Sequence, residues 1–204
     1  MAERGSLPIV GLLLAGLLSA CGGSPAATPG DVSGTRLEDG TFEVSATPLV
    51  DPTGGSYSLA DNTTKPLTLV FLGYTHCPDI CGQVMATLAG TMTRLDEADR
   101  ADVDVVFVTT DPQRDDEAVV DRYATKFDAD FLGLTGDLDD IVEVAQSVGI
   151  GVEQGEKLPS GGYDVTHGTQ VMAVDADDQV PVYWSHEVSQ AELAHDLQLL
   201  LDEG

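Results

Sequence analysis

The sequence predicts an α/β fold in which a central mixed β-sheet is flanked by helices. Two apolar runs, Leu67–Leu72 and Val103–Val108, are long enough for buried strands, and apolar residues at helical spacing follow each of them. Two further apolar runs, Thr169–Val174 and Val180–Trp184, are separated only by turn-forming residues. Because strands that alternate with helices pair in parallel and a closing hairpin adds antiparallel strands, the sheet is expected to be mixed.

Short strands are expected before the first strand–helix unit. Phe42–Ala46 and Ser56–Leu59 are strand candidates around turn residues, and they predict an N-terminal β-hairpin extension. After the strand Leu67–Leu72, a helix is expected from Pro78 to about Leu95, because proline favours the first helical position. The apolar side chains of that helix recur at helical spacing, at Ile80, Val84, Leu88 and Met92.

A second strand–helix unit and a third strand follow. The strand Val103–Val108 leads to an expected helix over Glu117–Phe127 and then to a short strand, Phe131–Leu134. Asp137 is the expected N-cap of the next helix, and Gly149 is expected to end it. This alternation predicts parallel strands joined by right-handed crossovers.

The last part of the chain completes the pattern. The Gly-rich stretch Ile150–Tyr163 is expected to be irregular, and the closing hairpin comes after it. Ser189 and Glu192 then form a capping box that opens a last helix through Leu200. This order of strands and helices is that of a thioredoxin-like fold, with a central mixed sheet, flanking helices and an N-terminal β-hairpin extension.

The charge of the chain excludes one class of partner. Nine basic residues stand against 35 acidic ones, and the net charge is −26. Nucleic-acid binding is excluded, because the phosphate backbone requires clustered Lys and Arg. We interpret the acidic surface as a solvated one; a docking face for a basic partner or for cations is the alternative.

The N-terminal segment predicts export. Arg4 precedes the apolar stretch Leu7–Leu18, which falls short of the roughly 20 residues that a membrane-spanning helix needs. Residues 18–21 read Leu-Ser-Ala-Cys and resemble a bacterial lipobox. That resemblance implies cleavage before Cys21 and lipidation of its sulfur.

Three segments are therefore expected along the chain. Residues 1–20 are the predicted lipoprotein signal peptide. Residues 21–40 are rich in Gly, Ser, Pro and Thr and are interpreted as a flexible membrane tether. Residues 41–204 form the predicted folded domain, which would be lipid-anchored to the outer face of the cell membrane.

Only two cysteines remain once Cys21 is assigned to the lipid. Cys77 and Cys81 lie four residues apart, where the first central strand ends and its helix is expected to begin. The helix dipole favours a thiolate at that position, and i, i+4 spacing places both sulfurs on one side. Because one short-range pair adds little as a structural disulfide, the pair is either a redox couple or half of a metal site.

The redox interpretation has two forms. A thioredoxin-type oxidoreductase usually has two residues between its cysteines, whereas three separate Cys77 from Cys81; a strained disulfide is still within reach. A thiol peroxidase fits less well, because its Thr-x-x-Cys spacing is absent from Thr75-His-Cys77. A redox couple therefore stays open as an alternative.

A metal site needs a third ligand, and four histidines are candidates. For His76, which neighbours Cys77, a turn residue is as good an interpretation as any functional role. His186 is interpreted as an exposed loop residue and His195 as a surface residue of the last helix. His167 immediately precedes the strand Thr169–Val174. In a thioredoxin-like fold, the loop before this strand faces the helix end that carries the cysteines, so the geometry selects His167.

Two thiolates and one imidazole are a soft, low-coordinate ligand set. Such a set suits Cu(I) and can also hold Cu(II). Structural zinc would want a fourth protein ligand, and catalytic zinc would need an open position and a base, so zinc is the second option.

Three segments resemble the Sco/SenC family of copper-binding, thioredoxin-like proteins. Residues 71–81 read Phe-Leu-Gly-Tyr-Thr-His-Cys-Pro-Asp-Ile-Cys, residues 110–115 read Thr-Asp-Pro-Gln-Arg-Asp, and residues 163–167 read Tyr-Asp-Val-Thr-His. All three occur in the order that the family has. The chain departs from the family pattern at Gly82, where proline is usual, and at the residues that flank His167.

The resemblance implies a copper site made by Cys77, Cys81 and His167, with Asp111 nearby to modulate it or to contact a partner. It also implies a role in assembling the binuclear copper centre of cytochrome c oxidase. The expected protein is a membrane-anchored copper metallochaperone rather than an enzyme. Its partner would be the copper-receiving oxidase subunit, while the copper donor is open.

Two rival functions share these residues. An extracytoplasmic thiol–disulfide oxidoreductase acting on cysteines of the oxidase subunit would need Cys77 and Cys81 but not His167. A redox or copper sensor that signals through a partner is the third alternative.

Overall fold

The structure is a computed structural model that describes residues 1, 31–38, 41–157 and 163–203. The side chains of residues 153, 154, 156, 157 and 163–167 lie outside that description. Residues 2–20 of the predicted signal peptide and most of the predicted tether, with Cys21, also fall outside it.

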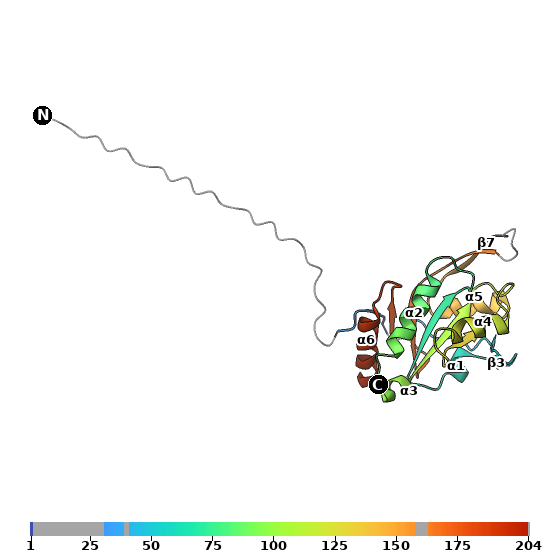
Figure 1. Ribbon diagram of the computed structural model, residues 1–204, viewed down its shortest axis with the longest axis horizontal. Helices are drawn as coiled ribbons and strands as arrows, with labels where there is room; N and C mark the ends of the chain where they lie inside the picture. Colours follow the sequence, from blue (N-terminus) through green and yellow to red (C-terminus); the bar gives the residue numbers. More distant parts are fainter. Residues whose placement is uncertain (2–30, 39–40, 158–162, 204) are drawn as a thin grey trace.

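A six-stranded sheet forms the centre of the domain, in the order β1-β10-β9-β4-β5-β6 (Figure 1). The strands β4, β5 and β6 pair in parallel, whereas β9 is antiparallel to β4. The predicted mixed sheet is therefore confirmed. The strands are β1 (Thr35–Arg36), β10 (Val182–Trp184), β9 (Val171–Asp175), β4 (Leu67–Gly73), β5 (Val103–Thr109) and β6 (Leu132–Leu134).

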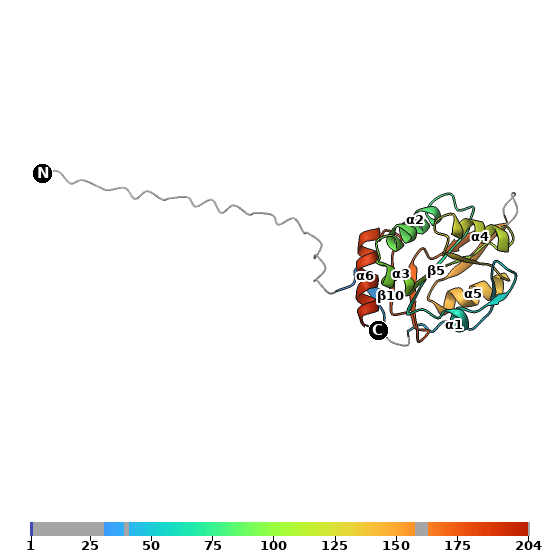
Figure 2. The same ribbon diagram turned by 60° about the horizontal axis from the view of Figure 1, so that its bottom comes forward.

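Helices cover both faces of this sheet, as Figure 2 shows. One face packs against α2 (Cys81–Met92), α4 (Glu117–Thr125) and α6 (Gln190–Glu203), and the other against α1 (Leu59–Asn62) and α5 (Leu138–Ser147). The short α3 (Glu97–Ala101) leads into β5. Because successive side chains of a strand alternate between faces, β4 sends Leu69 and Phe71 into the first core and Val70 and Leu72 into the second.

Several predicted element ends are confirmed in their chemistry. Ser189 and Glu192 exchange backbone–side chain hydrogen bonds at the start of α6, which is the predicted capping box. Gly149, with φ of 82°, follows α5, and a left-handed residue there suits glycine. Asp137 is the N-cap of α5, although its side chain makes no cap hydrogen bond.

The predicted N-terminal hairpin exists, but its first strand was assigned to the wrong residues. The hairpin pairs β2 (Leu49–Val50) with β3 (Ser56–Tyr57). The predicted strand Phe42–Ala46 is not formed; within it, Glu43 makes a single bridge to Gln179. The strand predicted to reach Leu59 ends earlier, because the Ser58 hydroxyl caps α1.

The described part of the stretch Ile150–Tyr163 is mostly a strand, which corrects the prediction that it is irregular. It contributes β7 (Val152–Lys157), which pairs with β8 (Tyr163–His167) as a separate antiparallel hairpin. In Figure 1 this hairpin projects beyond the central sheet. His167, the expected third metal ligand, is thus the last residue of a strand.

The folded part of the chain begins before the predicted boundary at Thr41. The edge strand β1 pairs with β10, and the buried carboxylate of Asp196 holds the residues before it. Asp196 accepts hydrogen bonds from Ser33 N–H (2.8 Å), Ser33 O–H (2.6 Å), Gly34 N–H (3.1 Å) and the Trp184 indole (2.7 Å). These contacts tie part of the predicted tether to the last helix.

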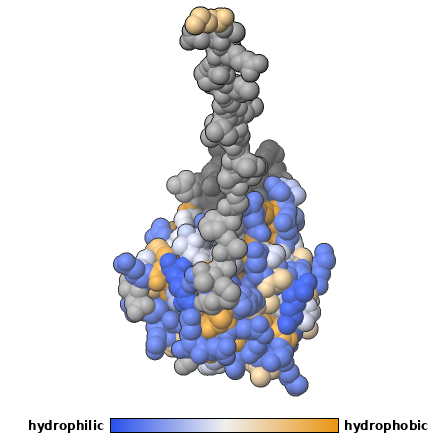
Figure 3. Space-filling view, turned by 90° about the vertical axis from the view of Figure 1, so that its left-hand side faces the viewer, coloured by the Kyte–Doolittle hydropathy of each residue, from blue (hydrophilic) through white to orange (hydrophobic). Residues whose placement is uncertain are grey.

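The face in Figure 3 is mostly hydrophilic, with small and separate hydrophobic areas. Among the residues that the structure describes, no helix has both the length and the apolar character needed to cross a bilayer.

Candidate metal centre

The two cysteines and His167 belong to segments that meet at one edge of the sheet. Residues 74–80 connect β4 to α2, so they leave the sheet at the carboxyl end of β4. Phe71, near that end, pairs with Val171 at the start of β9. Since β9 begins four residues after His167, the hairpin β7–β8 enters the sheet at the edge where the cysteine loop leaves it.

The helix α2 begins at Cys81 and not at Pro78, which corrects the predicted start. Pro78, Asp79 and Ile80 form bends, and the Ile80 side chain makes no cap hydrogen bond. The Cys77 sulfur instead receives hydrogen bonds from the backbone N–H groups of Asp79, Ile80 and Cys81. Cys77 therefore takes over the capping role that a serine or aspartate usually has.

Both cysteines are free thiols in this structure, and their environments differ. Partial burial opposes the thiolate of Cys77, but the hydrogen bond from the Cys81 thiol and those from the backbone N–H groups outweigh it and lower the pKa of Cys77. Burial, together with donation to Cys77, raises the pKa of Cys81 to about 12. The predicted thiolate is thus assigned to Cys77, the more exposed sulfur.

Cys81 packs tightly at the inner end of the loop. Its side chain is fully buried in the core, and a Cβ added to Gly73 would lie 3.0 Å from its sulfur. Tyr123 packs on Phe107 with the rings tilted by 45° and their centroids 4.9 Å apart, and its pKa is raised by burial and by the nearby Cys81 and Cys77. The inner sulfur therefore faces an apolar and aromatic wall.

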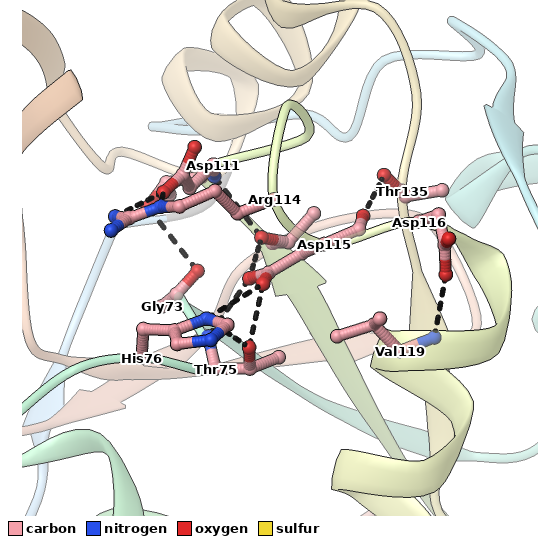
Figure 4. A network of polar contacts seen from close by, with 11 residues as sticks. Gly73, Thr75, His76, Asp111, Arg114, Asp115, Asp116, Val119 and Thr135 are labelled. Carbon is pink, nitrogen blue, oxygen red and sulfur yellow. Dashed lines mark hydrogen bonds and ion pairs between the residues drawn. The ribbon is translucent and has the colours of Figure 1, made fainter. Parts of the chain in front are cut away.

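The loop that carries Cys77 is fastened by Asp115, a residue that the sequence analysis did not single out (Figure 4). The Asp115 carboxylate is fully buried and accepts hydrogen bonds from Thr75 N–H (2.8 Å), Thr75 O–H (2.6 Å) and Thr109 O–H (2.7 Å). The Thr135 hydroxyl donates to its backbone carbonyl at 2.8 Å. The sequence could have indicated Asp115, because it belongs to the segment 110–115 that resembles the family pattern, but only Asp111 of that segment was expected to lie near the site.

Asp111 lies beside the loop and acts on it through a neighbour. The side chain is buried and forms an ion pair with Arg114. The Arg114 guanidinium lies 5.9 Å from the centre of the Tyr74 ring, three residues before Cys77. Asp111 therefore lies near the cysteine loop, as predicted, but it contacts the loop indirectly: it pairs with Arg114, and Arg114 lies over Tyr74.

Three of the four histidines have described side chains. His76 lies in the turn after β4 with 60% of its side chain exposed, and its Nδ1 lies 3.0 Å from the Thr75 hydroxyl. His195 is exposed on α6, as predicted. His186 was expected to be exposed and is instead half-buried, with Nδ1 3.2 Å from the Thr169 hydroxyl.

His167 is placed by its backbone alone. It pairs with Val152 across the β7–β8 hairpin, and its side chain lies outside the described part. Among the side chains that the structure describes, no three His, Cys, Asp or Glu residues are grouped closely enough to hold a metal ion. The third ligand thus stays a prediction.

Comparison with known proteins identifies the family. A family model described as SCO1/SenC matches residues 38–202, which is most of the chain. The chain belongs to the SCO1/SenC family. The resemblance indicated by residues 71–81, 110–115 and 163–167 is thereby confirmed.

Two of the curated relatives of this chain are mitochondrial SCO proteins. Protein SCO2 homolog of Mus musculus is 29% identical over 154 residues, covering 71% of this chain and 60% of the relative. Protein SCO1 homolog of Homo sapiens is 25% identical over 151 residues, covering 69% of this chain and 50% of the relative. The chain thus spans between half and 60% of the length of these two relatives.

Solved structures of the family confirm the thioredoxin-like α/β fold. Apo Sco1 from Thermus thermophilus superposes with a TM-score of 0.73 at 31% identity, covering 83% of this chain and 97% of that one. ScoI from Arabidopsis thaliana, solved with copper bound, gives a TM-score of 0.71 at 25% identity, covering 79% of this chain and 99% of that one.

The donor set of this SCO1/SenC chain fits a soft metal ion. A thiolate-prone sulfur at the surface and a second sulfur hydrogen-bonded to it can ligate together after both lose their protons. Copper binding would replace the thiol–thiol hydrogen bond by two sulfur–metal bonds. The aromatic wall behind Cys81 would limit access of water to that side.

Proposed function

We propose that this protein is a membrane-anchored copper metallochaperone that contributes to assembly of the binuclear copper centre of cytochrome c oxidase. The Cys77–Cys81 thiol pair on a fastened loop is the observation that carries the proposal. Two relatives in the same fold, from Arabidopsis thaliana and Bradyrhizobium japonicum, were solved with copper bound. The family is described as one of cytochrome c oxidase assembly proteins.

The proposed copper ligands are Cys77, Cys81 and His167. The two sulfurs supply the soft donors that hold Cu(I), and an imidazole adds the donor that also accommodates Cu(II). Cys77 is the sulfur through which the metal would enter and leave, because Cys81 is buried behind it. A sulfur-rich site with one exposed side suits transfer to a second thiolate site on a partner, here the copper-receiving oxidase subunit.

The proposed anchor is a lipid on Cys21. Its support is the export pattern of residues 1–20 and the lipobox-like residues 18–21. In a strain that makes the full chain, Cys21→Ala should shift the protein from the membrane to the soluble fraction and abolish incorporation of labelled fatty acid. Retention of the label by Cys21→Ala would contradict the proposed lipid anchor and would leave the proposed metal site unaffected.

A strain lacking the protein tests the function and separates it from its rival. The wild-type chain should restore the copper centre of the oxidase, measured by its absorption spectrum and by oxidase activity. Cys77→Ser and His167→Ala should both fail if the protein delivers copper. Full restoration by His167→Ala, with failure of Cys77→Ser, would instead establish a thiol–disulfide oxidoreductase.

A further inference from the structure

The hydrogen bonds around Thr75 fix the tautomer of His76 (Figure 4). A hydroxyl has one proton to donate, and the Thr75 hydroxyl lies 2.6 Å from the Asp115 carboxylate, which can only accept. Toward His76 Nδ1, at 3.0 Å, the Thr75 oxygen must therefore accept. The neutral imidazole carries its hydrogen on Nδ1, and the lone pair is left on Nε2.

The relay that fixes this tautomer is rigid. Asp115 is fully buried, and Thr75 N–H and Thr109 O–H hold its second carboxylate oxygen. The carboxylate also lies 3.5 Å from His76 Nδ1 itself. The orientation of the His76 ring is thus set from the interior, although most of its side chain is exposed.

Metal-ligating histidines almost always donate the hydrogen of their other ring nitrogen to a carboxylate, a backbone carbonyl or water, which fixes the tautomer. In His76 a hydroxyl backed by a carboxylate takes that place. If the role of His76 were only to complete the turn, nothing would require the lone pair to be on Nε2. His76 immediately precedes Cys77, the outer of the two proposed sulfur ligands. The hydrogen bonds thus engage Nδ1 and not Nε2, on a mostly exposed side chain beside Cys77 in sequence.

We propose that His76 is an additional copper ligand, the one that first captures Cu(I) and passes it to Cys77 and Cys81. This rests on the proposed function. A Cu–Nε2 bond forms as a bond to the copper donor breaks; two Cu–S bonds then form, and the Cu–Nε2 bond breaks. The two thiol protons pass to water, and copper stays Cu(I) throughout, so no electron is transferred.

Rapid-mixing kinetics test the capture step. Fully reduced protein is mixed with Cu(I) held by bicinchoninate, whose absorbance falls as the protein takes the metal. His76→Ala should take up copper about tenfold more slowly, a loss of the size seen when metal-site contacts are removed. Thr75→Val, which removes the hydroxyl that orients the ring, should slow uptake in the same direction. His195→Ala is the matched control, because it removes an exposed imidazole on α6.

The equilibrium and the ring nitrogens supply two further readouts. Copper affinity at equilibrium should change far less than the uptake rate in His76→Ala, because the sulfurs hold the delivered metal. Nitrogen NMR of the reduced apo protein should show a protonated Nδ1 and an unprotonated Nε2 for His76, and substoichiometric Cu(I) should perturb Nε2. An unprotonated Nδ1, or a Nε2 that Cu(I) leaves unchanged, overturns the inference.

The kinetic outcomes separate this inference from the proposed function. Wild-type uptake rates in His76→Ala, or equal slowing in His195→Ala, overturn the role of His76 alone. Failure of the wild-type chain to take copper from bicinchoninate, or uptake that Cys77→Ser leaves intact, overturns the proposed function itself.

Discussion

The Asp115 carboxylate binds both the backbone N–H and the hydroxyl of Thr75, at 2.8 and 2.6 Å, across 40 residues of chain. The contact joins the loop after β4 to the loop after β5, at the carboxyl ends of two adjacent parallel strands. Ligand sites in open α/β sheets gather at this edge. The buried Asp115 carboxylate therefore holds the cysteine loop in place through hydrogen bonds to Thr75 and Thr109 rather than to the sulfurs.

Replacing Asp115 should change the chemistry of Cys77 as well as the stability. Asp115→Asn weakens the acceptor of three hydrogen bonds, so the free energy of unfolding should fall by about 1–3 kcal/mol in urea denaturation. The loosened loop should also align fewer N–H groups on Cys77. Its alkylation by iodoacetamide near neutral pH should therefore slow down.

Asp196→Asn is the matched control for that experiment. Asp196 is an equally buried carboxylate with four hydrogen-bond donors, but it serves the N-terminal segment and α6. It should lose similar stability while Cys77 keeps its alkylation rate. Equal slowing in both variants would show that Asp115 acts only through general stability.

The two thiols should react in a fixed order as pH rises. The pKa of Cys77 is lowered below its ordinary value of 9.0, whereas that of Cys81 is raised to about 12. Alkylation of the native reduced protein at pH 8 should therefore modify Cys77 first, as mass spectrometry of the peptides would show. In denaturant the preference should disappear, and a native preference for Cys81 would contradict the assignment of the thiolate.

The raised pKa of Cys81 also predicts how the stability of the fold changes with pH. A group whose pKa is raised by folding favours the folded state while it is protonated. This contribution is complete below about pH 9 and is lost as pH rises toward about 12. Unfolding followed by circular dichroism should show that loss in the reduced protein and less of it in Cys81→Ser.

Two glycines near the site should respond oppositely to alanine. At Gly73 a Cβ would lie 3.0 Å from the Cys81 sulfur and 3.1 Å from the Phe107 ring, so Gly73→Ala should cost about 1–3 kcal/mol by overpacking. At Gly82, inside α2, a Cβ meets nothing within 4 Å, so Gly82→Ala should stabilise by about 0.5–1 kcal/mol. Urea denaturation of both variants checks the pair, and a stabilising Gly73→Ala would contradict the described packing.

The central part of the fold could be predicted because its signals are local. Leu67–Leu72 and Val103–Val108 are each apolar at all but one position, and buried parallel strands need that pattern. The capping box at Ser189 is likewise a short-range signal. Such elements form from residues that are neighbours in the chain.

Elements decided by distant contacts could not be predicted. β1 is two residues long, and its neighbour Ser33 is bound by Asp196, which is 163 residues away. β7 is rich in polar residues and contains Gly155, so neither apolar alternation nor β-propensity marked it. Both strands owe their existence to pairing partners rather than to their own composition.

The same contrast between local signals and distant contacts explains which residues of the site could be predicted. Cys77 and Cys81 stand out by number and spacing. The expected geometry of the fold selected His167, and that ligand stays a prediction because its side chain lies outside the described residues. Asp115 escaped because a buried carboxylate is recognised by its donors, and Thr75 and Thr109 come from two other segments. The start of α2 was misplaced because the Cys77 sulfur, and not Pro78, organises the first turn.

A Cu(I) competition titration tests the central claim most directly. Fully reduced protein should withdraw about one equivalent of Cu(I) from bicinchoninate, with a soft sulfur–nitrogen ligand set. Cys77→Ser, Cys81→Ser and His167→Ala should each bind copper more weakly, while His195→Ala should match the wild type. If His167→Ala holds copper as tightly as the wild type, the proposed three-ligand site is contradicted.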